Sequence, residues 1–254
     1  MTTIDPLTKT DLTTLRQAST ATLSTQLFRL GLRNQVLAGL RLVSRGGPPM
    51  VGEAFTLRYI PAREDIDTLK VYDDYDHPQR RAIESCPRDH VLVMDCRGEG
   101  RAASAGNILL TRLQVRGAAG CVTDGTLRDT PAIAGLSMSV YAAGASPMTN
   151  LAVHHAVDLQ VPIGCAGVAV YPGDVLVGDG DGVVCIPRHL VSVVAQQAEA
   201  QEHLEEFLLH KVENGAPLRG TYPPDDTMLD EYRDAADNTF PDNGTHHVRR
   251  PAQN

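Results

Sequence analysis

The sequence has no tryptophan, and the aromatic residues together make up only 4% of its 254 residues. A core must therefore be built from Val, Leu, Ile and Ala, which suit closely packed strands covered by helices. The hydrophobic content of 42% is enough for such a core. The length allows one large domain or two small ones, so a globular chain is expected.

Long hydrophobic runs and an excess of basic residues are also lacking. No apolar run approaches the roughly 18 residues that cross a bilayer, and the N-terminus, MTTIDPLTKTDLTTLRQ, is polar. We therefore expect neither membrane insertion nor export. The net charge of −8 disfavours a nucleic-acid backbone as the main partner, because phosphate binding needs a basic face.

The five cysteines contain no C-x-x-C pair, and most of them lie in apolar runs. This pattern predicts reduced thiols in the core of a cytoplasmic protein rather than disulfides or a metal site.

The spacing of apolar residues predicts both helices and strands. The passage 91–123 predicts strand, helix and strand, which favours a partly parallel sheet and an α/β fold. Residues 64–76 are expected to form a surface loop or a short helix. The predicted helices are 8–32, 106–117, 132–136 and 188–214, and the predicted strands are 50–60, 90–96, 120–124, 139–144, 161–170 and a pair within 171–187 joined at an Asp-Gly turn.

We expect residues 1–215 to form one domain and residues 216–254, rich in Pro, Asp and Asn, to form an extended arm or a disordered tail. A helix over 188–214 would be about 39 Å long at 1.5 Å per residue, longer than one domain of this size needs. Such a helix often reaches a neighbouring subunit.

The segment AGCVTDGTLRDTPAIA, residues 119–134, suggests chemistry. A buried strand is expected to halt at Asp124-Gly125, followed at once by Arg128-Asp129. Arg128 can pair with a carboxylate, and Asp129 can hold a hard divalent cation through oxygen. The alternative is an ordinary surface pair of opposite charges.

Gly106 precedes a predicted helix, whose first amides, those of Asn107, Ile108 and Leu109, can hold an anionic oxygen. Many glycines only cap helices. Here, however, the strand–helix–strand topology should bring Gly106 and Arg128-Asp129 to one edge of the sheet, where they would face one cleft.

The segment SAGNILLTRLQVRGAAGCVTDGTLRD resembles the RraA-like family, whose members share a glycine, an acidic residue, twenty residues and then Arg-Asp. The family includes the bacterial regulator of ribonuclease activity A and the 4-hydroxy-4-methyl-2-oxoglutarate aldolases. With VGEAFTL upstream and VPIGCAGVAVYPGDVLVGDGDGVVCIP downstream, the resemblance covers roughly residues 20–200.

The resemblance implies a three-layer β/β/α swivelling domain, assembled as a trimer or a dimer of trimers with active sites at subunit interfaces. It implies that Asp129 binds Mg²⁺ or Mn²⁺, largely with water, and that Arg128 contacts the substrate. The predicted site therefore has Asp129 as metal ligand and Arg128 and Asn107 as catalytic residues. Substrate-binding residues would be Gly106, Asn107, Ile108, Leu109 and Arg128.

This chain departs from the family pattern at two places. Asn107 replaces the acidic residue, and a neutral amide cannot deprotonate a water. The lysine that the aldolases carry after the Arg-Asp loop is absent from SVYAAGASPMTNLAVHHAV. His154 and His155 could supply a proton instead, or could be structural.

Three other groups of residues have both a functional and a structural reading. The basic island His77–Arg81 could bind a second carboxylate of the substrate or be a solvated loop. The acidic residues Glu202, Glu205 and Glu206 on the long helix could reach a neighbour's metal through water or form a solvated face. The Asp179–Gly182 segment lacks the ligand spacing of an EF-hand and predicts a hairpin turn.

These residues predict a metal-dependent carbon–carbon lyase that cleaves or decarboxylates a small 2-oxo acid and releases pyruvate or a close analogue. One alternative is a non-catalytic regulator that binds ribonuclease E or another protein. Another is a hydrolase or tautomerase of keto acids, because stabilising an enolate serves those reactions equally well.

Overall fold

The computed structural model describes residues 7–45 and 47–239 and divides the chain into two compact units, Met1–Glu199 and Ala200–Asn254. The first unit contains every strand named below and the predicted site. The long helix α6 (Val191–Glu213) crosses the boundary between the units.

The main sheet of the first unit has nine strands, with the order β1-β6-β5-β3-β2-β10-β11, while β4 pairs with β5 and β7 pairs with β2. The pairs β2–β3, β3–β5, β4–β5 and β5–β6 are parallel, as the strand–helix–strand passage predicted. Strands β8 and β9 form a separate hairpin. The strands are β1 (Arg41–Leu42), β2 (Met50–Pro61), β3 (His90–Asp95), β4 (Ala103–Ala105), β5 (Gly120–Leu127), β6 (Ser139–Ala145), β7 (His154–Leu159), β8 (Ile163–Cys165), β9 (Val168–Val170), β10 (Val175–Gly178) and β11 (Val183–Ile186).

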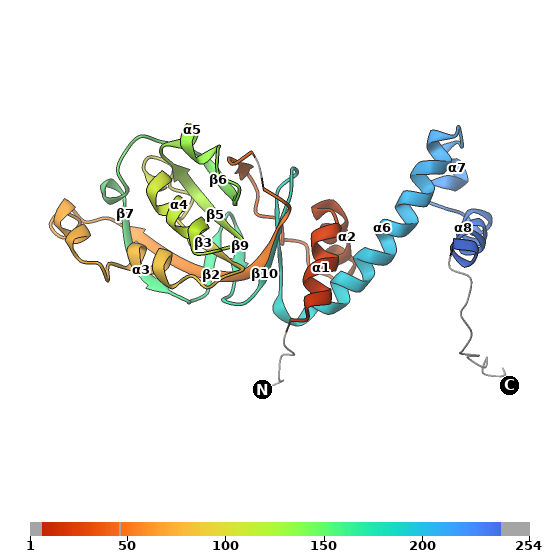
Figure 1. The fold of residues 1–254 in the computed structure, drawn as a ribbon, viewed down its shortest axis with the longest axis horizontal. Helices are drawn as coiled ribbons and strands as arrows, with labels where there is room; N and C mark the ends of the chain where they lie inside the picture. The colour runs from red at the N-terminus through yellow and green to blue at the C-terminus, as the bar shows by residue number, and fades with distance from the viewer. Residues whose placement is uncertain (1–6, 46, 240–254) are drawn as a thin grey trace. The chain divides into compact units, whose positions relative to one another are not determined.

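The three-layer β/β/α architecture follows from strands that are buried on both faces. Along β3, Leu92 and Met94 pack under the helices α3 (Pro78–Ser85), α4 (Asn107–Val115) and α5 (Thr130–Ile133), which cover one face of the sheet (Figure 1). Val91 and Val93 point the other way and pack with the β8–β9 hairpin. This alternation has the period of two that strands impose, so the predicted fold class is confirmed.

The N-terminal helical segment differs from the sequence prediction. The expected single helix over 8–32 is two helices, α1 (Lys9–Gln17) and α2 (Thr20–Arg29). Ser19 ends the continuity, because its backbone is extended and its side chain accepts a hydrogen bond from the amide of Thr22, as an N-cap does. Both helices pack with the first turns of α6 against β10 and β11.

Strand β5 was expected to end at Asp124-Gly125, but it continues to Leu127, with a register shift between Thr123 and Thr126. The Asp124 carboxylate accepts hydrogen bonds from the amides of Cys96 (2.6 Å) and Gly98 (2.9 Å). The buried aspartate therefore sits in an irregularity inside the strand, and Arg128-Asp129 follows the true end of β5.

Other differences are local. The segment 161–170 is the β8–β9 hairpin rather than one strand, β7 was not predicted, and α5 begins two residues earlier than expected. The Asp179–Gly182 turn joins β10 and β11 as predicted. Its Asp179 carboxylate also accepts hydrogen bonds from the amide (2.8 Å) and hydroxyl (2.7 Å) of Thr20, which ties the turn to the start of α2.

All five cysteines are buried and free, as predicted. Burial raises the pKa of the thiols of Cys86 and Cys96 to about 12, so both stay protonated at neutral pH.

The second unit is helical where an extended arm was expected. After α6 come α7 (Leu218–Thr221) and α8 (Asp226–Thr239), and residues 240–254 lie outside the described part. Lys211 on α6 forms an ion pair with Glu231 on α8, with 2.6 Å between Nζ and Oε2. The rings of Phe207 and Tyr232 lie 5.5 Å apart between the same two helices. These contacts explain the helix that composition alone did not indicate.

We expect Gly120→Ala to destabilise the first unit by about 1–3 kcal/mol, the usual cost of overpacking a core. A Cβ at Gly120 would lie 2.7 Å from Met50 Cγ and 3.0 Å from the carbonyl oxygen of Ser139. Urea unfolding measures the effect. Gly100→Ala is the control, because its nearest neighbour would be Thr126 Cγ2 at 3.5 Å; equal midpoints for both variants would contradict the prediction.

Candidate active site

A cavity of about 260 Å³ opens where β4 and β5 end and α4 begins. It brings together most of the predicted site residues with residues from the excursion before α3 and from the segment after β6. Its lining consists of Tyr72, Gln79, Arg80, Ala103, Ala105, Gly106, Ile108, Leu109, Arg128, Asp129, Thr149 and Asn150.

Gly106 allows the two halves of the predicted site to approach each other. It is the N-cap of α4, and the amide of Arg128 donates a hydrogen bond to the neighbouring Ala105 carbonyl at 3.1 Å. A Cβ at Gly106 would lie 2.8 Å from Asp129 Oδ2 and 3.0 Å from Arg128 Nε. Any larger residue would therefore displace the Arg-Asp pair.

Asp129 has a left-handed backbone, with φ of 61° and ψ of 30°. Its Oδ2 accepts a hydrogen bond from the amide of Asn107 at 3.3 Å and lies 3.8 Å from Arg128 Nε. The side chains of Arg128 and Asp129 are 49% and 53% exposed, so both can still contact a ligand. The αL conformation, which Asp tolerates better than most residues, turns the carboxylate toward the start of α4.

Of the three amides predicted to hold an anionic oxygen, those of Asn107, Ile108 and Leu109, one is therefore already hydrogen-bonded within the protein. The Asn107 amide is engaged by Asp129, while the amides of Ile108 and Leu109 lie in the same first turn of α4. The Asn107 side chain accepts a hydrogen bond from the Thr111 hydroxyl at 3.2 Å and is not part of the cavity lining. Asn107 thus contributes through its backbone.

Arg80 and Tyr72 form a stacked pair in the cavity wall. The Arg80 guanidinium carbon lies 4.4 Å from the centroid of the Tyr72 ring, within the range of a cation–π contact. Burial raises the pKa of the Tyr72 hydroxyl, whereas the positive charges of Arg80 and Arg128 oppose that rise. Of the basic island 77–81, Arg80 reaches the cavity, Arg81 is exposed, and His77 is buried against the Tyr72 ring.

Five lining residues were not singled out from the sequence, and Gln79 was considered only as part of the basic island 77–81. The five are Tyr72, Ala103, Ala105, Thr149 and Asn150. Gln79 and Asn150 are buried amides whose nitrogens donate to the Ser104 carbonyl at 2.6 Å and 3.4 Å. Residues so far apart in the sequence meet only through the fold. The acidic, tyrosine-containing composition of 64–76 was the only available signal for Tyr72.

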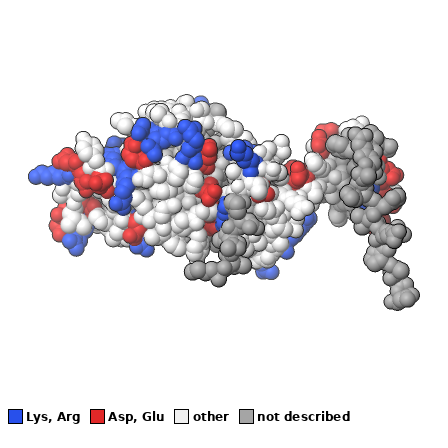
Figure 2. Space-filling model, turned by 60° about the horizontal axis from the view of Figure 1, so that its bottom comes forward, with Lys and Arg blue, Asp and Glu red and all other residues white. Residues whose placement is uncertain are grey.

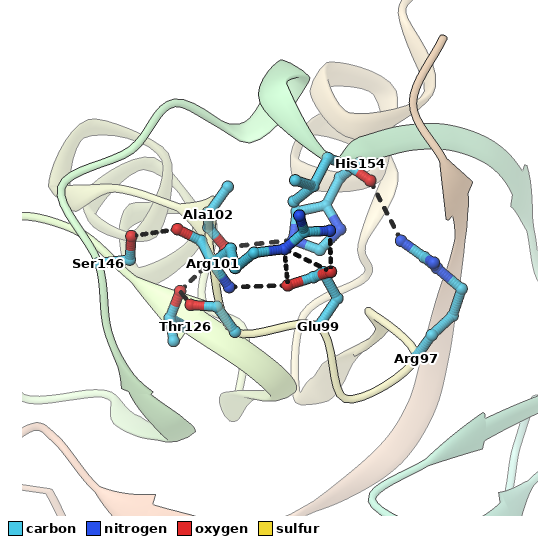
Figure 3. A network of polar contacts seen from close by, with 9 residues as sticks. Arg97, Glu99, Arg101, Ala102, Thr126, Ser146 and His154 are labelled. Carbon is cyan, nitrogen blue, oxygen red and sulfur yellow. Dashed lines mark hydrogen bonds and ion pairs between the residues drawn. The ribbon is translucent and has the colours of Figure 1, made fainter.

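The loop from β3 to β4 is held by a network of polar contacts (Figure 3). Glu99 accepts from the Arg101 guanidinium, with 2.6 Å between Arg101 Nη2 and Glu99 Oε2, and this hydrogen-bonded pair lowers the Glu99 pKa. The Ala102 carbonyl accepts from the Thr126 hydroxyl at 2.9 Å and lies 3.2 Å from His154 Nε2. The network fixes the segment that leads into β4 and Gly106.

Both histidines considered as proton donors lie outside the cavity lining. His154 is fully buried in the network of Figure 3, and burial lowers its pKa. His155 Nδ1 lies 2.6 Å from Asp67 Oδ1, a buried carboxylate. These partners favour the structural reading for both residues.

Asp129 could hold a divalent cation as its one carboxylate ligand from the described cavity, with waters and substrate oxygens as the other ligands. Within residues 7–45 and 47–239, no group of three or more His, Cys, Asp or Glu could enclose a metal ion. Mg²⁺ commonly keeps several waters and uses one or two carboxylates together with substrate oxygens, and a half-exposed Asp129 carboxylate suits that mode. Glu202, Glu205 and Glu206 lie in the second unit on α6, and their contact with a metal stays a prediction.

On the face shown in Figure 2, many basic side chains have acidic neighbours. The expectation of no nucleic-acid partner, which rests on the net charge of −8, stays a prediction. In the described part of the chain, no helix is both long and apolar enough for a transmembrane span.

Comparison with known proteins identifies the family. The chain is 37% identical over 123 residues to a Halalkalibacterium halodurans protein named "Putative 4-hydroxy-4-methyl-2-oxoglutarate aldolase", a match that covers 47% of this chain and 56% of that protein. Thus the chain matches little more than half of that relative's length.

Two solved structures extend the likeness over most of the chain. An uncharacterized protein from Pseudomonas syringae has a TM-score of 0.74 and 25% identity, covering 86% of this chain and 99% of that one. Streptomyces coelicolor RraAS2, described as an unusual member of the RNase ES inhibitor RraA protein family, has a TM-score of 0.69 and 27% identity, covering 80% and 97%. The RraA-like family model (Aldolase/RraA) matches residues 20–185, and the chain therefore belongs to the RraA-like family.

Proposed function

We propose that the protein is a divalent-metal-dependent carbon–carbon lyase that acts on a small 2-oxo acid and releases pyruvate or a close analogue. The observation that carries this proposal is the cavity in which Arg128, Asp129 and the first turn of α4 meet. The aldolase names of relatives such as the Halalkalibacterium protein support a lyase. A trimer or dimer of trimers is part of the same proposal.

Different residues of the cavity would bind the substrate carboxylate, its other oxygens and the cation. Arg128 pairs with the 2-oxo acid carboxylate, and the amides of Ile108 and Leu109 offer donors for its oxygens. Asp129 would hold Mg²⁺ or Mn²⁺. When bound, the cation supplies positive charge that favours negative charge on the C2 carbonyl oxygen. Leu109, which also packs against the core, gives the cavity wall an apolar part, while Ile108 is 83% exposed.

Arg80 suits a second carboxylate of the substrate. Its guanidinium lines the same cavity as Arg128, and stacking on the Tyr72 ring holds its plane. A cavity with two guanidinium groups and one carboxylate carries a net positive charge, which a bound divalent cation would increase, so it favours an acid with two negative groups.

We expect Arg80→Gln to raise the KM for a dicarboxylic 2-oxo acid such as oxaloacetate about 10- to 100-fold. Loss of a charged hydrogen bond typically costs about 1.5–3 kcal/mol. Steady-state kinetics measure the change. Arg81→Gln is the matched control, because Arg81 is the exposed neighbour on α3 and does not line the cavity. Equal KM values for both variants would remove Arg80 from the binding site.

The proposed activity is tested by a coupled pyruvate assay. Purified protein is incubated with oxaloacetate or a 4-hydroxy-2-oxo acid in the presence of Mg²⁺, Mn²⁺ or EDTA. Pyruvate release that requires the cation supports the lyase. If neither substrate class is turned over with any divalent ion, the lyase proposal is wrong.

A non-catalytic regulator is the second candidate, favoured by the likeness to Streptomyces RraAS2, a member of an RNase ES inhibitor family. Such a protein would bind a ribonuclease E-type enzyme and slow RNA cleavage without needing Asp129. Measuring ribonuclease inhibition beside the pyruvate assay separates the two candidates. A keto-acid hydrolase or tautomerase would instead be revealed by products other than pyruvate from the same substrates.

A further inference from the structure

Cleavage of a 2-oxo acid needs a proton donor as well as a cation. When the C3–C4 bond breaks, its electron pair passes into the C2 carbonyl and forms the enolate of pyruvate. In aldol cleavage C4 leaves as a carbonyl compound and its hydroxyl proton passes to solvent, whereas in decarboxylation C4 leaves as CO₂. The enolate then takes a proton at C3 to become pyruvate. A lyase without a donor at this position must wait for solvent to deliver that proton.

The cavity contains few groups that can donate a proton. Among its lining residues the titratable side chains are Tyr72, Arg80, Arg128 and Asp129. A guanidinium group does not act as a proton donor to carbon in proteins, and the Asp129 carboxylate already accepts a hydrogen bond from the Asn107 amide and lies beside Arg128. The remaining candidates from the sequence, Asn107 and the two histidines of β7, are not part of the lining.

We propose that Tyr72 is the general acid that delivers the proton to C3 of the enolate. Its ring forms part of the wall shared with Arg128 and Asp129. Arg80 on one side and the His77 ring, 5.4 Å away and edge-on, limit its movement. This assignment rests on the proposed lyase function, and the proton that Tyr72 gives up is replaced from solvent after product release.

The surroundings suit both protonation states of this phenol. Burial raises the Tyr72 pKa and keeps the hydroxyl protonated before the bond breaks. The phenolate formed afterwards has two positive neighbours, Arg80 and Arg128, whose charges lower the same pKa and stabilise the anion. Asp67 opposes this effect, but its carboxylate is engaged by His155.

Exchange of the pyruvate methyl protons in D₂O isolates this step, because a C3 proton is removed and a deuteron is returned while no carbon–carbon bond is broken. We expect wild-type protein with Mg²⁺ to exchange the protons, as measured by NMR, and Tyr72→Phe to exchange them about 10²- to 10⁴-fold more slowly. Tyr72→Phe should still bind oxalate and melt at the wild-type temperature. Tyr75→Phe is the matched control, because that side chain is 90% exposed and does not line the cavity.

The outcomes separate this inference from the proposed function. If wild-type protein neither releases nor exchanges pyruvate, the lyase proposal fails and the role of Tyr72 falls with it. If wild-type protein does both and Tyr72→Phe exchanges at the wild-type rate, only the assignment of Tyr72 is overturned. Loss of oxalate binding in Tyr72→Phe would also overturn it, since Tyr72 would then act in binding.

Discussion

Asp129→Asn is expected to lower lyase turnover at least about 10³-fold while leaving the fold intact. Removing the carboxylate takes away the group that would hold the cation, and several kcal/mol of charge stabilisation correspond to a factor of this size. Stability should change little, because the side chain is half exposed and Asn tolerates the left-handed backbone at this position.

Initial rates of pyruvate release, compared with thermal melting, measure the effect of Asp129→Asn. Asp89→Asn provides a matched control, because Asp89 also has a positive φ, 62°, but does not line the cavity. The control should keep wild-type turnover. Substantial turnover by Asp129→Asn with Mg²⁺ would show that the cation, if needed, binds elsewhere.

Gly106→Ala is expected to reduce turnover about 10²-fold or more with a small change in stability. The backbone at Gly106 is extended, with φ of −129° and ψ of −180°, a conformation that alanine adopts readily. The new methyl group would instead collide with the side chains of Asp129 and Arg128. Displacement of reacting groups by about 1 Å can cost a factor of this size.

In Gly106→Ala, the loss of turnover should therefore be large, whereas the change in the free energy of unfolding, measured with urea, should be small. Gly164→Ala serves as control, because no atom lies within 4 Å of the Cβ it would add and its φ is not positive. We expect that variant to match wild type in both measurements. A large loss of stability in Gly106→Ala, with unchanged turnover of the folded fraction, would show that the close approach of Gly106 to Arg128 and Asp129 does not matter for turnover.

The part of the site that was predictable from sequence lies within one strand–helix–strand unit. Gly106 starts the helix and Arg128-Asp129 ends the next strand, so the topology of parallel strands brings them to one edge. The hydrogen bond from the Asn107 amide to Asp129 realises that expectation. Local pattern was sufficient here because the connection is short and regular.

Tyr72 and Arg80 could not be placed in the same way. They come from the segment between β2 and β3, where Tyr72 lies in a 3₁₀ helix (Leu69–Asp73) without buried residues and Arg80 lies on α3, and only packing in three dimensions brings both to the cavity. The same limit explains α8, whose contacts with α6 depend on residues about twenty positions apart. The irregularity in β5 was misread because Asp-Gly is typical of turns.

The central claim is that Asp129 and the Arg128 loop hold one divalent cation and one 2-oxo acid together. Electron paramagnetic resonance of Mn²⁺ titrated into the protein, with and without oxalate as a mimic of the pyruvate enolate, tests this claim most directly. We predict one Mn²⁺ per chain, bound more tightly with oxalate and lost in Asp129→Asn. Mn²⁺ binding that ignores both oxalate and the substitution would contradict the claim.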